Sequence, residues 1–122
     1  MRFALIILSI FAIALSTNLD PYSETNKFLL SIWEHTKAKN YTIIDPEFFG
    51  IVDNVTYNKE EFIKNIVNPG PDEELPKLNV TNATFDAKGM LVFDLIYSHI
   101  EKFTAKPNAN IKGGYTLLKL KI

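Results

Sequence analysis

Apolar residues dominate the stretch from residue 90 to residue 105, which contains no Gly, Pro or Asn. Its first half is rich in β-branched and aromatic side chains, which suit a pleated, half-buried surface. A turn-forming run precedes it at residues 86–89, and a polar loop follows it at residues 107–110. The pattern predicts one long central strand over 90–105, with an antiparallel partner strand on either side.

Alternating apolar and polar residues predict the partner strands at 78–85 and 115–122, the second entered through Gly113-Gly114. Gly89 suits a type I turn followed by a bulge, and that register places Asn82 opposite Asp94 on a polar face. The other face then collects Phe85, Leu91, Phe93, Leu95 and Tyr97.

Two helices and a small hairpin are predicted before the sheet. Asp20 followed by Pro21 marks the start of a helix that continues at helical spacing to about Lys39. Asn58 and Glu61 resemble a capping box that opens a second, short helix. Between them, Asp45 to Gly50 predicts one or two helical turns, and Asp53-Asn54 predicts a hairpin turn. This order of elements indicates an α+β fold with the helices on the apolar face of a curved sheet.

Residues 1–16 have the pattern of a secretory signal peptide. Met1-Arg2 places one positive charge before an apolar run from Phe3 to Leu15, and Ala14-Leu15-Ser16 fits the small-x-small cleavage pattern. The run is shorter than the roughly 20 apolar residues of a membrane-spanning helix. We therefore expect cleavage after residue 16, a secreted, extracellular protein, and a single domain over residues 17–122.

Charge and cysteine content exclude several classes of function. After cleavage the chain would carry 12 Lys+Arg against 14 Asp+Glu, a net charge of −2. We therefore expect no nucleic-acid partner and no membrane partner after cleavage. The chain has no cysteines, so thiolate chemistry and disulfides are excluded. Burial must hold the fold, and nine Phe, five Tyr and one Trp supply large apolar areas for it.

Four Asn-x-Thr triplets are candidate acceptors of N-linked glycan, and none has Pro in the middle. They begin at Asn40, Asn54, Asn79 and Asn82. We expect Asn54 to be the best acceptor, because it would lie at a loop tip. Asn79 is the weakest candidate, because the predicted register turns it to the face opposite Asn82.

The order of elements resembles the nuclear transport factor 2-like superfamily, also called SnoaL-like, and in particular its secreted nematode members of uncharacterised function. The resemblance covers nearly all of the mature chain and rests on Phe28–Trp33, Asp45–Gly50, Val55–Tyr57, Asn58–Phe62, Lys88-Gly89, Phe103–Lys106 and Gly114–Leu117. It implies a cone in which a curved antiparallel sheet wraps around N-terminal helices. In different members the cone is an enzyme site, a small-ligand pocket or a partner surface, and pairing of sheets implies a homodimer.

Few residues are candidates for chemistry. Tyr97, His99 and Asp94 are the candidate catalytic residues, because ketosteroid isomerases of this superfamily use a cone-lining Asp as general base. Strand parity opposes this use, since it turns Asp94 away from Tyr97 and His99. The second histidine, His35, falls beside the apolar stripe of the first helix, and neither histidine has a carboxylate at metal-ligand spacing. We expect no metal site and no cofactor.

Aromatic residues are expected to line the cone, namely Trp33, Phe49, Phe93, Tyr97 and Tyr115. We expect a secreted glycoprotein whose domain is non-catalytic and binds a protein partner or a small apolar ligand. One alternative is an isomerase-like or cyclase-like enzyme that uses Tyr97, His99 or Asp94. Another is a carrier of a small apolar molecule. The volume and lining of the cone distinguish these hypotheses.

Overall fold

The computed structural model describes residues 19–67, 79–96 and 99–122. The predicted signal peptide and Tyr97 lie outside the described residues. Six strands form one sheet in the order β2-β1-β6-β5-β4-β3. All neighbours are antiparallel except β1 and β6. The elements are α2 Pro21–Lys37, η1 Tyr41–Ile43, β1 Ile44–Val52, β2 Val55–Asn58, α3 Lys59–Phe62, η2 Ile63–Val67, β3 Asn79–Phe85, β4 Leu91–Ile96, β5 Ile100–Pro107 and β6 Tyr115–Lys121.

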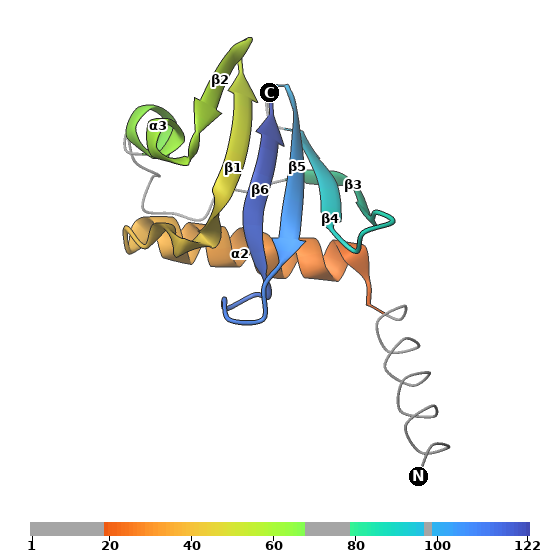
Figure 1. The fold of residues 1–122 in the computed structure, drawn as a ribbon. Helices are drawn as coiled ribbons and strands as arrows, with labels where there is room; N and C mark the ends of the chain where they lie inside the picture. Colours follow the sequence, from red (N-terminus) through yellow and green to blue (C-terminus); the bar gives the residue numbers. More distant parts are fainter. Residues whose placement is uncertain (1–18, 68–78, 97–98) are drawn as a thin grey trace, which may run out of the picture.

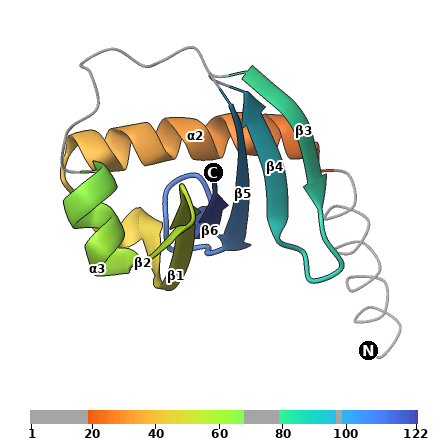
Figure 2. The same ribbon diagram turned by 90° about the horizontal axis from the view of Figure 1, so that it is seen from above.

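The sheet curves, and α2 lies across one of its faces (Figures 1 and 2). We call this covered face the inner face and the opposite one the outer face. The buried side of α2 places Phe28 edge-on against Phe93 and Tyr115, with ring centroids 6.0 Å apart in both pairs. Phe93 in turn stacks on Phe103 at 4.9 Å. These contacts confirm the predicted α+β fold with a helix on the apolar sheet face.

The predicted helix starts are confirmed. The Asp20 carboxylate accepts a hydrogen bond from the Tyr22 amide at 3.1 Å, and Pro21 follows as the first helical residue. At α3, Asn58 and Glu61 form a complete capping box, in which each side chain accepts from the backbone amide of the other. Both starts are local sequence signals, which explains why they can be read without the tertiary structure.

The predicted single strand over 90–105 is wrong, because the chain reverses within it. β4 and β5 are antiparallel neighbours, and Ile96 pairs with Ile100. Three residues separate Ile96 from Ile100, so odd-numbered residues of β4 pair with odd-numbered residues of β5, for example Leu95 with Glu101. The odd-numbered residues therefore face inward on both strands, so the inward parity is the same before and after the reversal.

The predicted short helix over 45–50 is also wrong, because these residues belong to β1. The Asp45 carboxylate accepts from the Glu47 amide at 2.9 Å, which is the local bond that made the segment resemble a helix cap. Pairing with β6 and β2 fixes an extended backbone instead. The predicted hairpin turn is confirmed, with Asp53 and Asn54 at φ 50° and 66°.

The register of β3 is confirmed at one sequon and wrong at the other. Asn82 lies opposite Asp94, as predicted. A bulge at Thr81 then shifts the pairing, so that Val80 lies opposite Leu95 and Asn79 opposite Ile96. The extra residue turns Asn79 to the outer face, the same face as Asn82, and not to the opposite face.

The predicted alternation of the last strand is wrong at one point, because β6 contains a second bulge. Lys119 lies opposite Thr104, whereas Leu117 lies opposite Ala105, so Leu118 is the extra residue. Leu117 and Leu120 are therefore both buried, with 4% exposure each. This places two leucines on the inner face, where they help to line a cavity.

Candidate functional site

A cavity of about 220 Å3 lies between the helices and the inner face of the sheet. Its walls come from α2, from the η1–β1 junction, from α3 and η2, and from β5, β6 and the residue that follows β6. The lining is Ile32, Thr36, Ile43, Ile44, Phe62, Ile66, Val67, Glu101, Phe103, Leu117, Leu120 and Ile122. Ten of these twelve side chains are purely apolar, so the cavity favours an apolar occupant.

Thr36 contributes little polarity to the cavity. Its hydroxyl donates to the backbone of its own helix, at 2.9 Å from the Ile32 carbonyl and 3.1 Å from the Trp33 carbonyl. A hydroxyl that donates to its own helix backbone has no proton left to donate to a ligand, and the methyl group of the side chain remains for packing. The remaining polar group in the lining is the Glu101 carboxylate.

Glu101 is the one charged residue in this lining. It follows the inward parity of β5, on which Phe103 and Ala105 are buried, and its side chain is 22% exposed. Its Oε1 lies 3.1 Å from Nε2 of His99, whose own side chain is 47% exposed. The carboxylate therefore lies between the cavity and solvent. Sequence reasoning missed Glu101, although the odd-residue parity of residues 91–105 would have found it.

Two of the three predicted catalytic residues, Asp94 and His99, lie among the described residues, and they do not meet in the cavity. Asp94 lies on the outer face, opposite Asn82 on β3 and opposite Lys102 on β5. His99 is exposed and is not part of the cavity lining. Tyr97 is outside the described residues. Asp94 and His99 thus form no joint acid–base site.

The four predicted lining aromatics that the structure describes do not line this cavity. Phe93 and Tyr115 fill the core, with 1% and 7% exposure. Burial raises the pKa of the Tyr115 hydroxyl, and the nearby Glu24 carboxylate raises it further. These two rings therefore pack against Phe28 and do not line the cavity.

Phe49 and Trp33 also lie outside this cavity. Phe49 is 41% exposed and pairs with Lys119 of β6, so it lies on the outer face. Trp33 is half-buried, with the Lys37 ammonium 4.7 Å from its ring centroid. Its indole Nε1 is buried without a hydrogen-bond partner. The aromatic residues were predicted by type, but their positions depend on strand and helix faces that only the packing fixes.

All four sequon asparagines are exposed. Asn40 caps η1, where its side chain accepts from the Thr42 amide at 3.2 Å and from the Thr42 hydroxyl at 2.7 Å. Asn54 lies in the β1–β2 turn, and Asn79 and Asn82 lie on edge strand β3. Each site is sterically open to a glycan, and glycosylation itself stays a prediction.

Residues 19–67, 79–96 and 99–122 contain no group of three or more His, Cys, Asp or Glu side chains able to hold a metal ion. In the same ranges, no helix is long and apolar enough to cross a membrane.

Comparison with known proteins identifies the fold. No protein-family model matches the chain, and no curated protein matches it. Among solved structures, the chain is similar to the S. rosetta CaMKII hub, with 13% sequence identity and a TM-score of 0.53. The match covers 82% of this chain and 90% of the hub chain. Together with the helix-covered, curved sheet, it shows that the chain has the nuclear transport factor 2-like fold.

Proposed function

We propose that the protein is a secreted, non-catalytic module that binds a small apolar molecule in its inner cavity. The apolar lining is the observation that carries this proposal. An engineered cavity of roughly 150 Å3 with a similar lining stays dry and binds benzene. A cavity of about 220 Å3 therefore suits one aromatic ring with a short alkyl chain, and it is smaller than the roughly 300 Å3 of a drug-sized site.

The separation of the polar candidates supports a non-catalytic role. A catalytic proton-transfer pair needs both of its groups within hydrogen-bond reach of one substrate. Asp94 lies on the outer face and His99 is exposed on the β4–β5 turn. The back-bonded Thr36 and the lone Glu101 leave the cavity without a second reactive group. A binding module fits this arrangement better than an isomerase-like or cyclase-like enzyme.

The binding proposal is tested with ethylbenzene as the probe, by ligand-observed NMR titration. Ile66→Trp fills the cavity from the η2 wall, where Ile66 is 37% exposed and can accept a larger ring. Val55→Trp is the matched control, because Val55 is 50% exposed on β2 and does not line the cavity. We expect wild type and V55W to bind equally and I66W to bind at least tenfold more weakly. Absence of wild-type binding, or equal binding by I66W, contradicts the proposal.

Secretion and glycosylation are part of the same proposal and are supported by the signal-peptide pattern of residues 1–16 and by four exposed sequons. Intact-mass measurement of protein from a secreting eukaryotic host tests both. We expect loss of residues 1–16 and a mass that falls after N-glycosidase treatment. Retention of residues 1–16 would contradict secretion, and a mass unchanged by the enzyme would contradict glycosylation.

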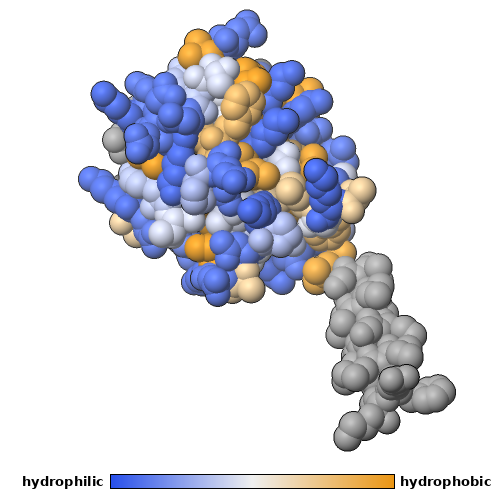
Figure 3. All heavy atoms as spheres, in the orientation of Figure 1, coloured by the Kyte–Doolittle hydropathy of each residue, from blue (hydrophilic) through white to orange (hydrophobic). Residues whose placement is uncertain are grey.

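The outer face favours a second candidate function, the binding of a protein partner. Three side chains on this face, Phe49, Ile96 and Ile100, are 41%, 43% and 57% exposed. Figure 3 views the molecule from this side, with small hydrophobic areas between hydrophilic side chains. A second copy of the chain is the partner that the resemblance implies. Sedimentation equilibrium tests it, with Phe49→Glu expected to dissociate the dimer; a wild-type monomer at high protein concentration contradicts it.

A further inference from the structure

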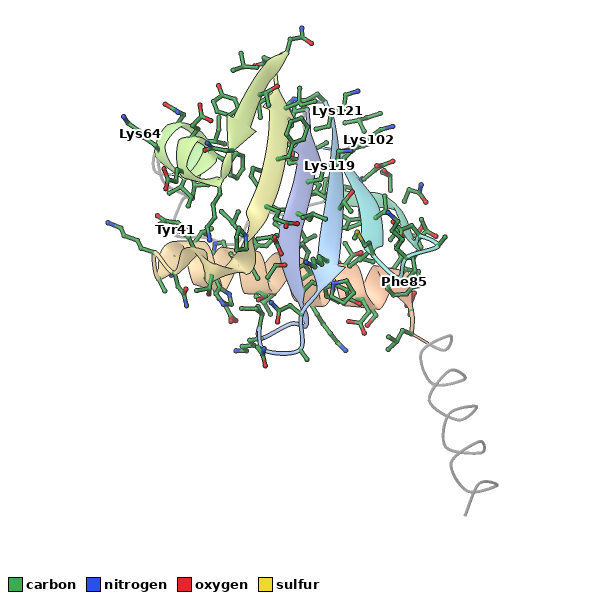
Figure 4. The ribbon with its side chains drawn as sticks, in the orientation of Figure 1. Tyr41, Lys64, Phe85, Lys102, Lys119 and Lys121 are labelled. Atoms are coloured by element: carbon green, nitrogen blue, oxygen red, sulfur yellow. The ribbon has the colours of Figure 1, made fainter. Side chains whose placement is uncertain are left out.

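Three lysines project from neighbouring strands of the outer face. Lys102 of β5 lies directly opposite Lys121 of β6, and Lys119 lies two residues before Lys121 on the same face (Figure 4). All three side chains are exposed, and none forms an ion pair in the described part of the chain. The net charge of −1 for the whole chain conceals this local concentration of positive charge.

Placing two lysines opposite each other costs stability. Like charges directly opposite on adjacent strands repel one another and destabilise the pairing. The only acid next to them in the register is Asp94, which lies opposite Lys102 and forms no ion pair with it in the described residues. A fourth lysine of this face, Lys106, already contacts the buried Asp45 carboxylate at 3.9 Å. The trio thus forms no ion pair and is offset by one neighbouring carboxylate at most, so a bound anion would stabilise it.

The spacing of the trio favours an extended anion over a single phosphate. Residues two apart on a strand are roughly 6.5 Å apart, and neighbouring strands are about 4.8 Å apart. The three ammonium groups therefore extend along an exposed sheet surface and do not converge on one point. The exposed ring of Phe49 lies beside Lys119, on the adjacent strand β1. Sugar rings can pack on such an aromatic face while their sulfate groups meet the lysines.

We infer that the outer face binds a sulfated polysaccharide, with Lys102, Lys119 and Lys121 as the anion-binding residues and Phe49 as an apolar contact. A membrane surface fits less well, because polybasic lipid-binding segments use about 4–8 Lys or Arg. The inference is independent of the inner cavity, since none of these four residues lines it. Binding should weaken steeply with salt, as expected for exposed charges.

Heparin affinity chromatography and calorimetry on the full mature chain test this inference. Lys119→Gln should lower heparin affinity about fivefold, the effect of one surface cation. Lys121→Glu should lower it further and also raise Tm by about 2–5 °C, because it replaces the like-charge pair with an opposite-charge pair. Lys64→Glu is the matched control, since this exposed lysine lies on η2 away from the face (Figure 4).

The expected result is salt-dependent binding of heparin that is lowered by K119Q and K121E and less affected by K64E. De-sulfated heparin and a single-stranded oligonucleotide should bind at least tenfold more weakly than heparin. An equal loss of heparin affinity in K64E and in K121E would show a non-specific effect of charge and would overturn the inference. Equal binding of the oligonucleotide, or no heparin binding because a second copy covers the face, would also overturn it. A fall in Tm for K121E would contradict the repulsion on which the inference depends.

Discussion

The loop between β5 and β6 rests on α2 so closely that Gly113 has no room for a side chain. Its φ is 93°, and a Cβ built there would lie 2.9 Å from the Cβ of Ser31 and 3.5 Å from the Lys27 carbonyl oxygen. The Ser31 hydroxyl donates to the Lys112 carbonyl, which holds the loop on the helix. Gly113→Ala should therefore destabilise the fold by two separate effects.

The neighbouring glycine separates these effects. Gly114 has a similar φ of 83°, but a Cβ built there meets nothing within 4 Å. Gly114→Ala should cost only the left-handed backbone strain, roughly 1–2 kcal/mol. Gly113→Ala should cost about 1–3 kcal/mol more, the usual range for overpacking.

Urea denaturation measures both free energies of unfolding, and the difference between the two variants gives the contact alone. We expect the free energy of unfolding of G113A to be below that of G114A by that added amount. Equal values within about 0.5 kcal/mol would refute the close approach of the loop to Ser31. The contact matters for the cavity, because this loop leads directly into β6, which supplies Leu117 to the lining.

Three further predictions concern the cavity, a helix cap and a buried hydroxyl. The Glu101 carboxylate should repel anionic ligands, so phenylacetate should bind at least tenfold more weakly than ethylbenzene in NMR titrations. Glu101→Gln should reduce this difference in affinity. An unchanged difference would show that the carboxylate does not face the ligand. Asn58→Ala should lower the free energy of unfolding by about 1 kcal/mol, because it removes the capping box. Urea denaturation measures this loss, with Asn110→Ala as the exposed control. Equal free energies of unfolding for the two variants would contradict the role of the cap. The raised pKa of Tyr115 means that the unfolded state loses this proton first, so the contribution of Tyr115 to stability should be constant below pH 10 and fall as pH rises above it. Thermal unfolding scans should show a smaller fall above pH 10 for Tyr115→Phe, and an identical fall would refute the assignment.

Local signals in the sequence determined the ends of several elements. Asp20-Pro21 and the Asn58–Glu61 pair satisfy free amides within one helical turn, and Asp53-Asn54 adopts positive φ within one two-residue turn. The pairing of Asn82 with Asp94 follows from one short loop and from the separation of polar and apolar faces. In each case the interacting groups are close in sequence, so the pattern carries the information.

The tertiary structure alone decided the features that depend on how strands pair. β4 and β5 have the same inward parity on either side of the reversal after Ile96, so periodicity cannot reveal that reversal. The bulge at Thr81 and the extended backbone around Asp45 arise from ladders with β4, β6 and β2, whose hydrogen bonds override local preference. The cavity and the exposed lysines of the outer face follow from the same strand pairings. A sequence pattern reports which face a residue occupies along its own strand, whereas a site forms where faces of different elements meet, and that meeting is fixed by packing across the whole chain.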